Sequence, residues 1–210
     1  MSREDVVNIE TCKARIETEA RALLKVKEQV DVAYIQAITA IMNCKGRLII
    51  TGLGKTGHIG KKIAASFASL GVPAYFVHSC ESLHGDMGMI TKEDVVIMIS
   101  NSGKSPEILN MLPPLKIIGA KTISITKSKD TPLAKETDIA IKCDAGPELD
   151  HNGLAPTTSA IAALAVGDAL ATVVCEAKGF SREDFALSHP GGALGQALLK
   201  EYNKQVAKTS

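Results

Sequence analysis

One segment of the chain, residues 99–109 (ISNSGKSPEIL), has the composition of a phosphate-binding loop. Ser100, Ser102 and Ser105 supply hydroxyl donors, and Gly103 permits a turn that points backbone N–H groups inward. Serine followed by proline at positions 105–106 is also typical of a helix start. Hydroxyls, amides and a helix N-terminus together favour a phosphate monoester, although an ordinary capped turn can have the same composition.

A glycine-rich stretch, residues 52–58 (GLGKTGH), is a second candidate for chemistry. It is not a P-loop, because that motif needs four residues between its glycines and this stretch has one. It does satisfy the GxGxxG pattern of dinucleotide-binding folds. However, His78 stands where that pattern expects an acidic residue, so a dinucleotide site is weakly supported.

The composition excludes several classes of partner. The 210 residues include 24 basic and 23 acidic side chains, so the chain lacks the positive charge that duplex nucleic acid requires. Aromatic residues make up 3 % and tryptophan is absent, which argues against stacking on single-stranded nucleic acid. The apolar stretch 160–175 is too short to span a membrane, so we expect a buried helix there. We expect neither a nucleic-acid partner nor a membrane.

The five cysteines are an odd number, lie far apart and include no CxxC pair. This pattern predicts neither a disulfide framework nor a thiolate zinc site. Residues 1–10 also lack the apolar core of a signal peptide. We therefore expect a cytoplasmic protein with reduced thiols.

The elements that must position the two loops alternate along the chain. Short apolar strands are expected at residues 47–51, 74–77, 95–99, 122–126 and 139–141. Apolar residues at helical spacing follow the first strand and recur over residues 105–119 and 156–178. This alternation predicts an α/β fold, a three-layer α-β-α sandwich around a five-stranded parallel sheet. Ligands of such sheets bind at the carboxyl ends of the strands, where both loops fall.

The two ends of the chain lie outside this alternation. Residues 3–45 have helical periodicity, with Leu23, Val26, Val30 and Ala33 on one face. They predict one long helix or a broken pair, packed on the domain itself or on a second subunit. We expect three parts: an N-terminal helical segment 1–46, a core domain 47–200 and a frayed tail 201–210.

Five motifs follow one another in the chain: GLGKTGHIGKKIAASFASLG (52–71), HGDMGMI (84–90), ISNSGKSPEIL (99–109), GLAPTTS (153–159) and FALSHPGGALG (185–195). Together, residues 48–195 resemble the SIS (sugar isomerase) family of phosphosugar-binding domains. Within it they are similar to isomerases of D-arabinose 5-phosphate. The resemblance implies a flavodoxin-like strand order and an aldose–ketose isomerisation that interconverts D-arabinose 5-phosphate and D-ribulose 5-phosphate through a cis-enediol. That reaction would supply Kdo for lipopolysaccharide or capsule.

The resemblance also implies the residues of the site. Catalytic roles fall on Lys55, Glu107, Glu148 and His189. Substrate binding falls on Gly54, Thr56, His84, Ser100, Asn101, Ser102, Gly103, Ser105 and Thr126. No cofactor is required, and His78 is implied as a ligand of zinc that would inhibit rather than catalyse. The implied partners are a small phosphosugar and further copies of the chain, in a homotetramer in which His189 acts across subunits.

These residue types suit an isomerisation, which needs acid–base groups. A carboxylate whose pKa is raised by burial can take the C2 proton, so Glu148 and Glu107 are both candidates. We favour Glu148, because Glu107 stands at a predicted helix N-terminus that favours its ionised form and lowers its basicity. Lys55 suits stabilisation of the enediolate, and His189 suits the proton transfer of ring opening.

Two departures from the family pattern leave alternatives open. Lys104 stands where the family often has an acidic residue, and its charge could shift the preference among phosphosugars. The paired CBS modules that often follow this domain are missing, since only 15 residues follow Gly195. The alternatives are a non-catalytic phosphosugar sensor and an isomerase of another sugar phosphate.

Overall fold

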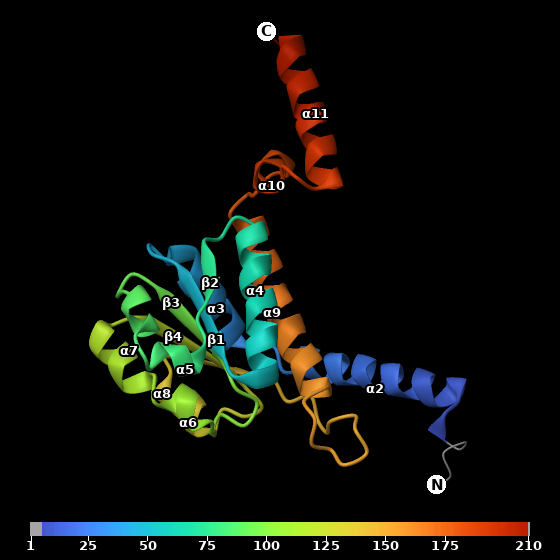
Figure 1. Ribbon diagram of the computed structural model, residues 1–210, viewed down its shortest axis with the longest axis vertical. Coiled ribbons are helices and arrows are strands. Elements are labelled where there is room, and N and C mark those ends of the chain that lie inside the picture. The colour runs from blue at the N-terminus through green and yellow to red at the C-terminus, as the bar shows by residue number, and fades with distance from the viewer. Residues whose placement is uncertain (1–5, 210) are drawn as a thin grey trace.

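A five-stranded parallel sheet forms the centre of the protein (Figure 1). The computed structural model describes the backbone of residues 6–209 and the side chains of residues 6–193 and 195–202. The strands are β1 (Leu48–Gly52), β2 (Ala74–Phe76), β3 (Val95–Ile99), β4 (Lys121–Thr126) and β5 (Ile139–Lys142). Their order across the sheet is β2-β1-β3-β4-β5, which confirms the predicted strands and the flavodoxin-like order.

Alternating apolar side chains along the strands build one core on each face of the sheet. Ile50 and Ile97 are register partners on β1 and β3 and share a core with the first helical layer. That layer contains α3 (Val32–Asn43), α4 (Gly54–Ser69) and α9 (Thr158–Ala177). Val96 and Met98 belong to the opposite core. The helices on that side are α5 (Ser79–Ser82), α6 (Pro106–Leu109), α7 (Leu112–Ile118) and α8 (Pro132–Glu136), with the 3-10 helix η1 (Asp86–Met89). The predicted three-layer α/β architecture is confirmed.

Two of the predicted helical stretches each form two helices, and for residues 3–45 this is the broken pair, one of the two predicted alternatives. The stretch 3–45 forms α2 (Ile9–Lys27) and α3, because Asp31 accepts a hydrogen bond from the Ala33 N–H and starts a new helix. Val30 lies in the break and is exposed, so it does not share the predicted apolar face. The stretch 105–119 forms α6 and α7, with two prolines in the first turn of α7, where a missing N–H is tolerated.

Helix α9 is a long apolar helix. It is long and apolar enough to cross a membrane by length and composition, and half of it is buried inside the protein. It packs against α4, α2 and α3. Burial on this scale is typical of the core helix of a globular domain, as the sequence predicted for residues 160–175.

The chain ends in two further helices, α10 (Arg182–Ser188) and α11 (Ala193–Thr209). They form an arm beyond the carboxyl-terminal ends of α4 and α9 (Figure 1). The prediction of a frayed tail at 201–210 is wrong over residues 201–209, since α11 continues to Thr209. At the base of the arm the Phe180 ring lies over Gly71, where a Cβ atom would come within 2.3 Å of it.

The contact between α4 and α9 depends on a residue without a side chain. Gly167 of α9 is buried, and a Cβ atom there would lie 2.5 Å from the side chain of Ile63 on α4. Both helices begin at segments that carry candidate site residues, since α4 begins after β1 and α9 begins after the loop that follows β5. Close approach of the two helices therefore matters for function.

We therefore expect Gly167→Ala to lower the free energy of unfolding by about 1–3 kcal/mol, the usual cost of overpacking a core. This cost outweighs the gain of up to about 1 kcal/mol in helix propensity. Urea denaturation measures the difference. Gly88→Ala is the matched control, because a Cβ atom there meets nothing within 4 Å. Equal stability of Gly167→Ala and the wild type would contradict the proposed packing constraint.

Candidate active site

The strand order brings the candidate residues to one edge of the sheet. The order reverses between β1 and β3, and ligands of such sheets bind at the carboxyl ends of the strands near this reversal. Because all five strands are parallel, the loops after β1, β2, β3, β4 and β5 all leave from that edge. The segments that begin with these loops, together with the last residues of the strands, carry every predicted site residue except His189, which lies on the arm.

The serine loop after β3 forms a turn whose hydroxyls face one another. Gly103 adopts φ +61°, and a Cβ atom there would lie 2.5 Å from Thr131, so only glycine fits. Its N–H donates to Ser100 Oγ at 3.2 Å. Ser105 occupies the N-cap position of α6, as predicted, but its side chain makes no capping hydrogen bond. Ser105 Oγ and Ser100 Oγ are hydrogen-bonded to each other at 3.4 Å, which uses one of their two O–H donors and leaves the other for an anion.

The glycine-rich stretch after β1 starts α4. Gly54 adopts φ +56° at the first position of the helix. Lys55 follows it and is exposed, with no ion pair to any described residue. The Thr56 hydroxyl donates to Leu53 O at 2.8 Å and accepts from Leu53 N at 3.3 Å, which closes the first turn. An ammonium group thus lies at the carboxyl edge of β1.

Glu148 lies in the loop between β5 and α9 and caps that helix from outside. Its Oε2 atom accepts hydrogen bonds from Thr157 N at 2.8 Å, Thr157 Oγ1 at 3.2 Å and Ser159 N at 3.1 Å. Desolvation by burial raises the pKa of Glu148, but the hydrogen bonds from Ser159 and Thr157 outweigh it and leave the pKa below its usual value. The expectation that burial raises this pKa is therefore wrong, and the carboxylate is ionised at neutral pH.

The two oxygens of this carboxylate have different environments. All three hydrogen bonds of Glu148 go to Oε2, and no described residue donates to Oε1. Oε1 therefore has a free lone pair on a side chain whose other oxygen is firmly held.

Glu107 lies half-buried in the first turn of α6, as predicted. Both carboxylates consequently stand at helix N-termini. Glu148 was favoured as the base because only Glu107 was expected at a helix N-terminus. That difference between the two residues is therefore not present. What distinguishes Glu148 is its fixed Oε2 atom.

The two histidines after β2 do not form a recognisable metal centre with other described residues. His78 is the N-cap of α5, and its Nδ1 atom accepts from Cys80 N at 3.3 Å. His84 is exposed and follows α5. Among the described residues no group of three His, Cys, Asp or Glu side chains is close enough to hold a metal ion. The zinc role of His78 stays a prediction.

His189 lies on the arm, at the end of the domain opposite to the strand ends. Its Nε2 atom is 2.9 Å from Ser69 Oγ, and its Nδ1 atom is 2.9 Å from Phe185 O. A carbonyl can only accept, so Nδ1 carries a proton. Ser69 is the last residue of α4, and Lys55 lies in its first turn. The two residues are therefore about 21 Å apart along the helix axis, at 1.5 Å per residue. His189 does not reach the site of its own chain.

A small cavity is lined by three residues that were predicted for the site and by two polar residues that were not. Thr56, Asn101 and Thr126 line it together with Ser159 and Cys143. Burial of the Cys143 thiol, with a smaller effect from Asp144, raises its pKa to about 12, so the thiol is neutral. Cys143 gave no signal in the sequence. The run of hydroxyl residues at 157–159 did, since it directly precedes a long apolar helix.

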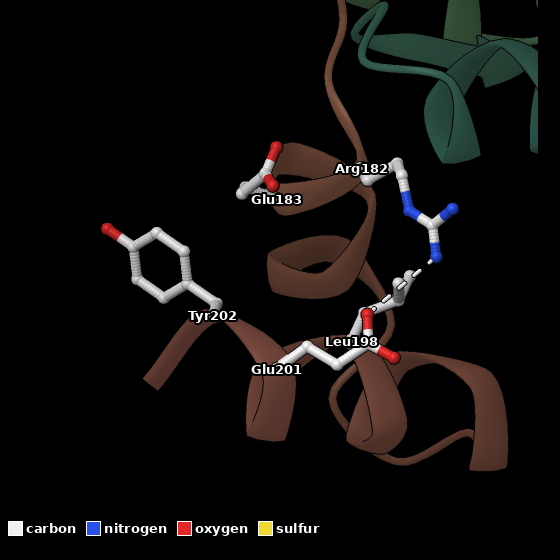
Figure 2. Close-up of a pocket in the computed structure, with 5 residues that line it drawn as sticks. All are labelled: Arg182, Glu183, Leu198, Glu201 and Tyr202. Atoms are coloured by element: carbon white, nitrogen blue, oxygen red, sulfur yellow. Dashed lines mark ion pairs between the residues drawn. The ribbon is translucent and has the colours of Figure 1, made fainter. Parts of the chain in front are cut away.

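A larger pocket lies on the arm and is unrelated to these residues. Figure 2 shows this pocket of about 270 Å³ between α10 and α11, with Arg182 and Glu201 on its wall. The two side chains are 3.8 Å apart and strongly exposed, a kind of ion pair that contributes little to stability. The remaining lining residues are Glu183, Leu198 and Tyr202. None of the predicted site residues lines this pocket.

Comparisons with known proteins match the chain to one protein family. The SIS domain model matches residues 41–173. Arabinose 5-phosphate isomerase KdsD of Pseudomonas aeruginosa is 50 % identical over 166 residues, 79 % of this chain and 51 % of that protein. KdsD of Escherichia coli K12 is 45 % identical over 185 residues, 88 % of this chain and 56 % of that protein. The chain thus spans about half the length of these relatives.

A solved structure agrees over its whole length. It is c3406 of Escherichia coli CFT073 in complex with arabinose 5-phosphate, with a TM-score of 0.85 and 41 % identity, and the match covers 90 % of this chain and all of that one. The family model covers well over half of the chain, and the fold, strand order and motifs agree with it. The chain therefore belongs to the SIS domain family.

Proposed function

We propose that this chain is an aldose–ketose isomerase that interconverts D-arabinose 5-phosphate and D-ribulose 5-phosphate. The names of the relatives and the ligand of the neighbouring structure support this substrate. The observation that carries the proposal is the Glu148 carboxylate, ionised and with Oε1 free, at the same sheet edge as the serine loop and Lys55. A sensor needs only the loop that binds phosphate.

In the proposed reaction Glu148 Oε1 takes the proton from C2 of the open-chain aldose. The electrons of the C–H bond form the C1–C2 double bond, and the carbonyl oxygen on C1 takes up a proton to give the cis-enediol. The proton from the hydroxyl on C2 then leaves, and Glu148 returns its proton to C1 to give the ketose. The ammonium of Lys55 stabilises the negative charge that develops on oxygen.

The phosphate is proposed to bind at Ser100, Ser102, Gly103 and Ser105. Their hydroxyls and turn geometry support this role. Asn101, Thr56, Gly54 and Thr126 are proposed to contact the rest of the substrate, and His84 remains a proposed contact from the loop after α5. The five free cysteines support a cytoplasmic location. Use of the aldose, D-arabinose 5-phosphate, for Kdo synthesis is the corresponding place in metabolism.

His189 is proposed to act in the site of a neighbouring subunit of a homotetramer. Its distance from its own site supports this, since ring opening needs a proton donor close to the sugar. Exposed apolar side chains on α2 and α3 support association. They are 61 to 72 % exposed: Ile9, Ile16, Leu24, Val32 and Ile35. A pocket of about 780 Å³ between α2 and residues 149–151 also borders the loop that carries Glu148.

The first test is a panel of pentose, hexose and heptose phosphates, each with and without EDTA. We expect turnover of D-arabinose 5-phosphate and no loss of rate on addition of EDTA, because the mechanism uses protein side chains only. Tight binding of a phosphosugar without turnover of any would instead support the sensor. Loss of rate with EDTA would indicate a catalytic metal and contradict the inhibitory role expected of zinc at His78.

Separate Glu148→Gln and Glu107→Gln variants test the base. Since Gln cannot take a proton but keeps the shape of the side chain, we expect Glu148→Gln to lose about 10²- to 10⁴-fold in kcat. It should also lose exchange of the C2 proton with solvent deuterium, measured by NMR. Exchange that survives in Glu148→Gln and disappears in Glu107→Gln would assign the base to Glu107.

Co-expression of two inactive variants tests the shared site. Lys55→Ala and His189→Ala chains with different tags should form mixed oligomers that isomerise the sugar, since one site then has both native side chains. Lys55→Ala with Glu148→Gln is the matched control and should stay inactive, because both side chains come from the same subunit. Mixed Lys55→Ala and His189→Ala oligomers without activity would contradict the sharing of His189.

A further inference from the structure

A small cavity at the carboxyl ends of β3 and β4 has room for one small polar group. Its volume is about 10 Å³, close to the space that a single water molecule needs. Its wall combines apolar atoms of Ile99 and Ile125 with polar side chains. The serines of the phosphate-binding loop, Ser100, Ser102 and Ser105, are not among the described residues that line it. The cavity is therefore separate from the proposed phosphate position.

One hydroxyl on this wall has no partner. Ser159 lines the cavity in the first turn of α9, and the residue is 7 % exposed. Its Oγ atom is buried and makes no hydrogen bond within the described residues. It lies near enough to the Glu148 carboxylate to help lower the pKa of that group, yet without hydrogen-bond geometry. Buried hydroxyls without a partner are rare and destabilise the free protein.

The other hydroxyls on the wall are occupied. Thr56 Oγ1 donates to Leu53 O at 2.8 Å, and Thr126 Oγ1 donates to Ser128 O at 2.8 Å. Each has therefore used its single O–H donor. Ser159 Oγ keeps both its donor and its lone pairs for a molecule that enters the cavity.

We propose that the Ser159 hydroxyl binds one hydroxyl or carbonyl oxygen of the sugar chain, beside the carbon atom whose proton Glu148 takes. The inference rests on the proposed function and deepens it. The same residue holds Glu148 through its backbone N–H, at 3.1 Å from Oε2. Ser159 thus connects the carboxylate to the sugar, so that binding of one oxygen sets the position of the neighbouring carbon relative to the base.

The neutral thiol of Cys143 on the same wall is compatible with this role. A thiol is a weak hydrogen-bond partner, so it does not compete strongly for the entering oxygen. Size selects as well, because a cavity for one oxygen admits a hydroxyl and excludes a larger substituent such as an acetamido group.

Ser159→Ala tests the assignment, and Thr158→Val is the matched control. The Thr158 hydroxyl is also buried and unpartnered, but it does not line the cavity. We expect Ser159→Ala to raise KM for D-arabinose 5-phosphate about tenfold, the size of one buried hydrogen bond, and to lower kcat as well, because the reacting carbon is then less firmly held against the base. Thr158→Val should leave both constants unchanged. Thermal unfolding without ligand should show both variants at least as stable as the wild type, because each loses an orphan hydroxyl.

Binding measured by calorimetry separates this inference from the proposed function. Ser159→Ala should bind D-arabinose 5-phosphate about tenfold more weakly, the loss of one hydrogen bond, and inorganic phosphate as tightly as the wild type. Equal weakening for both anions would overturn the role of Ser159 in holding the sugar. Unchanged binding of both anions, the result expected if water alone fills the cavity, would overturn it as well. Wild-type binding without turnover would refute the isomerase while leaving the calorimetric test of Ser159 intact.

Discussion

The Glu148 carboxylate and the N-terminus of α9 depend on each other. A helix start leaves backbone N–H groups without partners, and the N-cap Thr157 makes no capping bond with its own side chain. Glu148, nine residues earlier, supplies the missing acceptor, while Leu149 N donates to Thr157 Oγ1 at 2.8 Å. This pair of contacts ties the loop between β5 and α9 to the helix. The carboxylate is thereby fixed in place, ionised, and able to present only one oxygen to a substrate.

Much of the fold was predictable because its signals are local. The strands are short apolar runs such as 95–99, buried on both faces, and these runs allow little other interpretation. Strand and helix in alternation then leave a parallel sheet as the main solution. The serine loop was predictable too, since Gly103 and Ser105 have conformational roles that depend only on neighbouring residues. The clustering of the loops at one edge followed from topology.

What the sequence could not predict depends on contacts between distant residues. The pKa of Glu148 follows from hydrogen bonds that form only when its loop folds back on α9, so burial alone gave the wrong direction. Cys143, directly after β5, and Ser159, in the first turn of α9, line the same cavity, which no spacing in the chain indicates. The break before α3, one of two alternatives predicted for residues 3–45, has a local signal, because Asp31 is an ordinary N-cap residue.

The arm of α10 and α11 has a consequence for how the protein would be controlled. With His189 held against Ser69, a subunit on its own contains a carboxylate and an anion cradle but lacks the imidazole. A newly made chain would thus bind sugar phosphate before it was able to convert any. Under the proposed sharing of His189 between subunits, specific activity would fall on dilution as oligomers dissociate, and cellular concentration would act as a threshold for turnover.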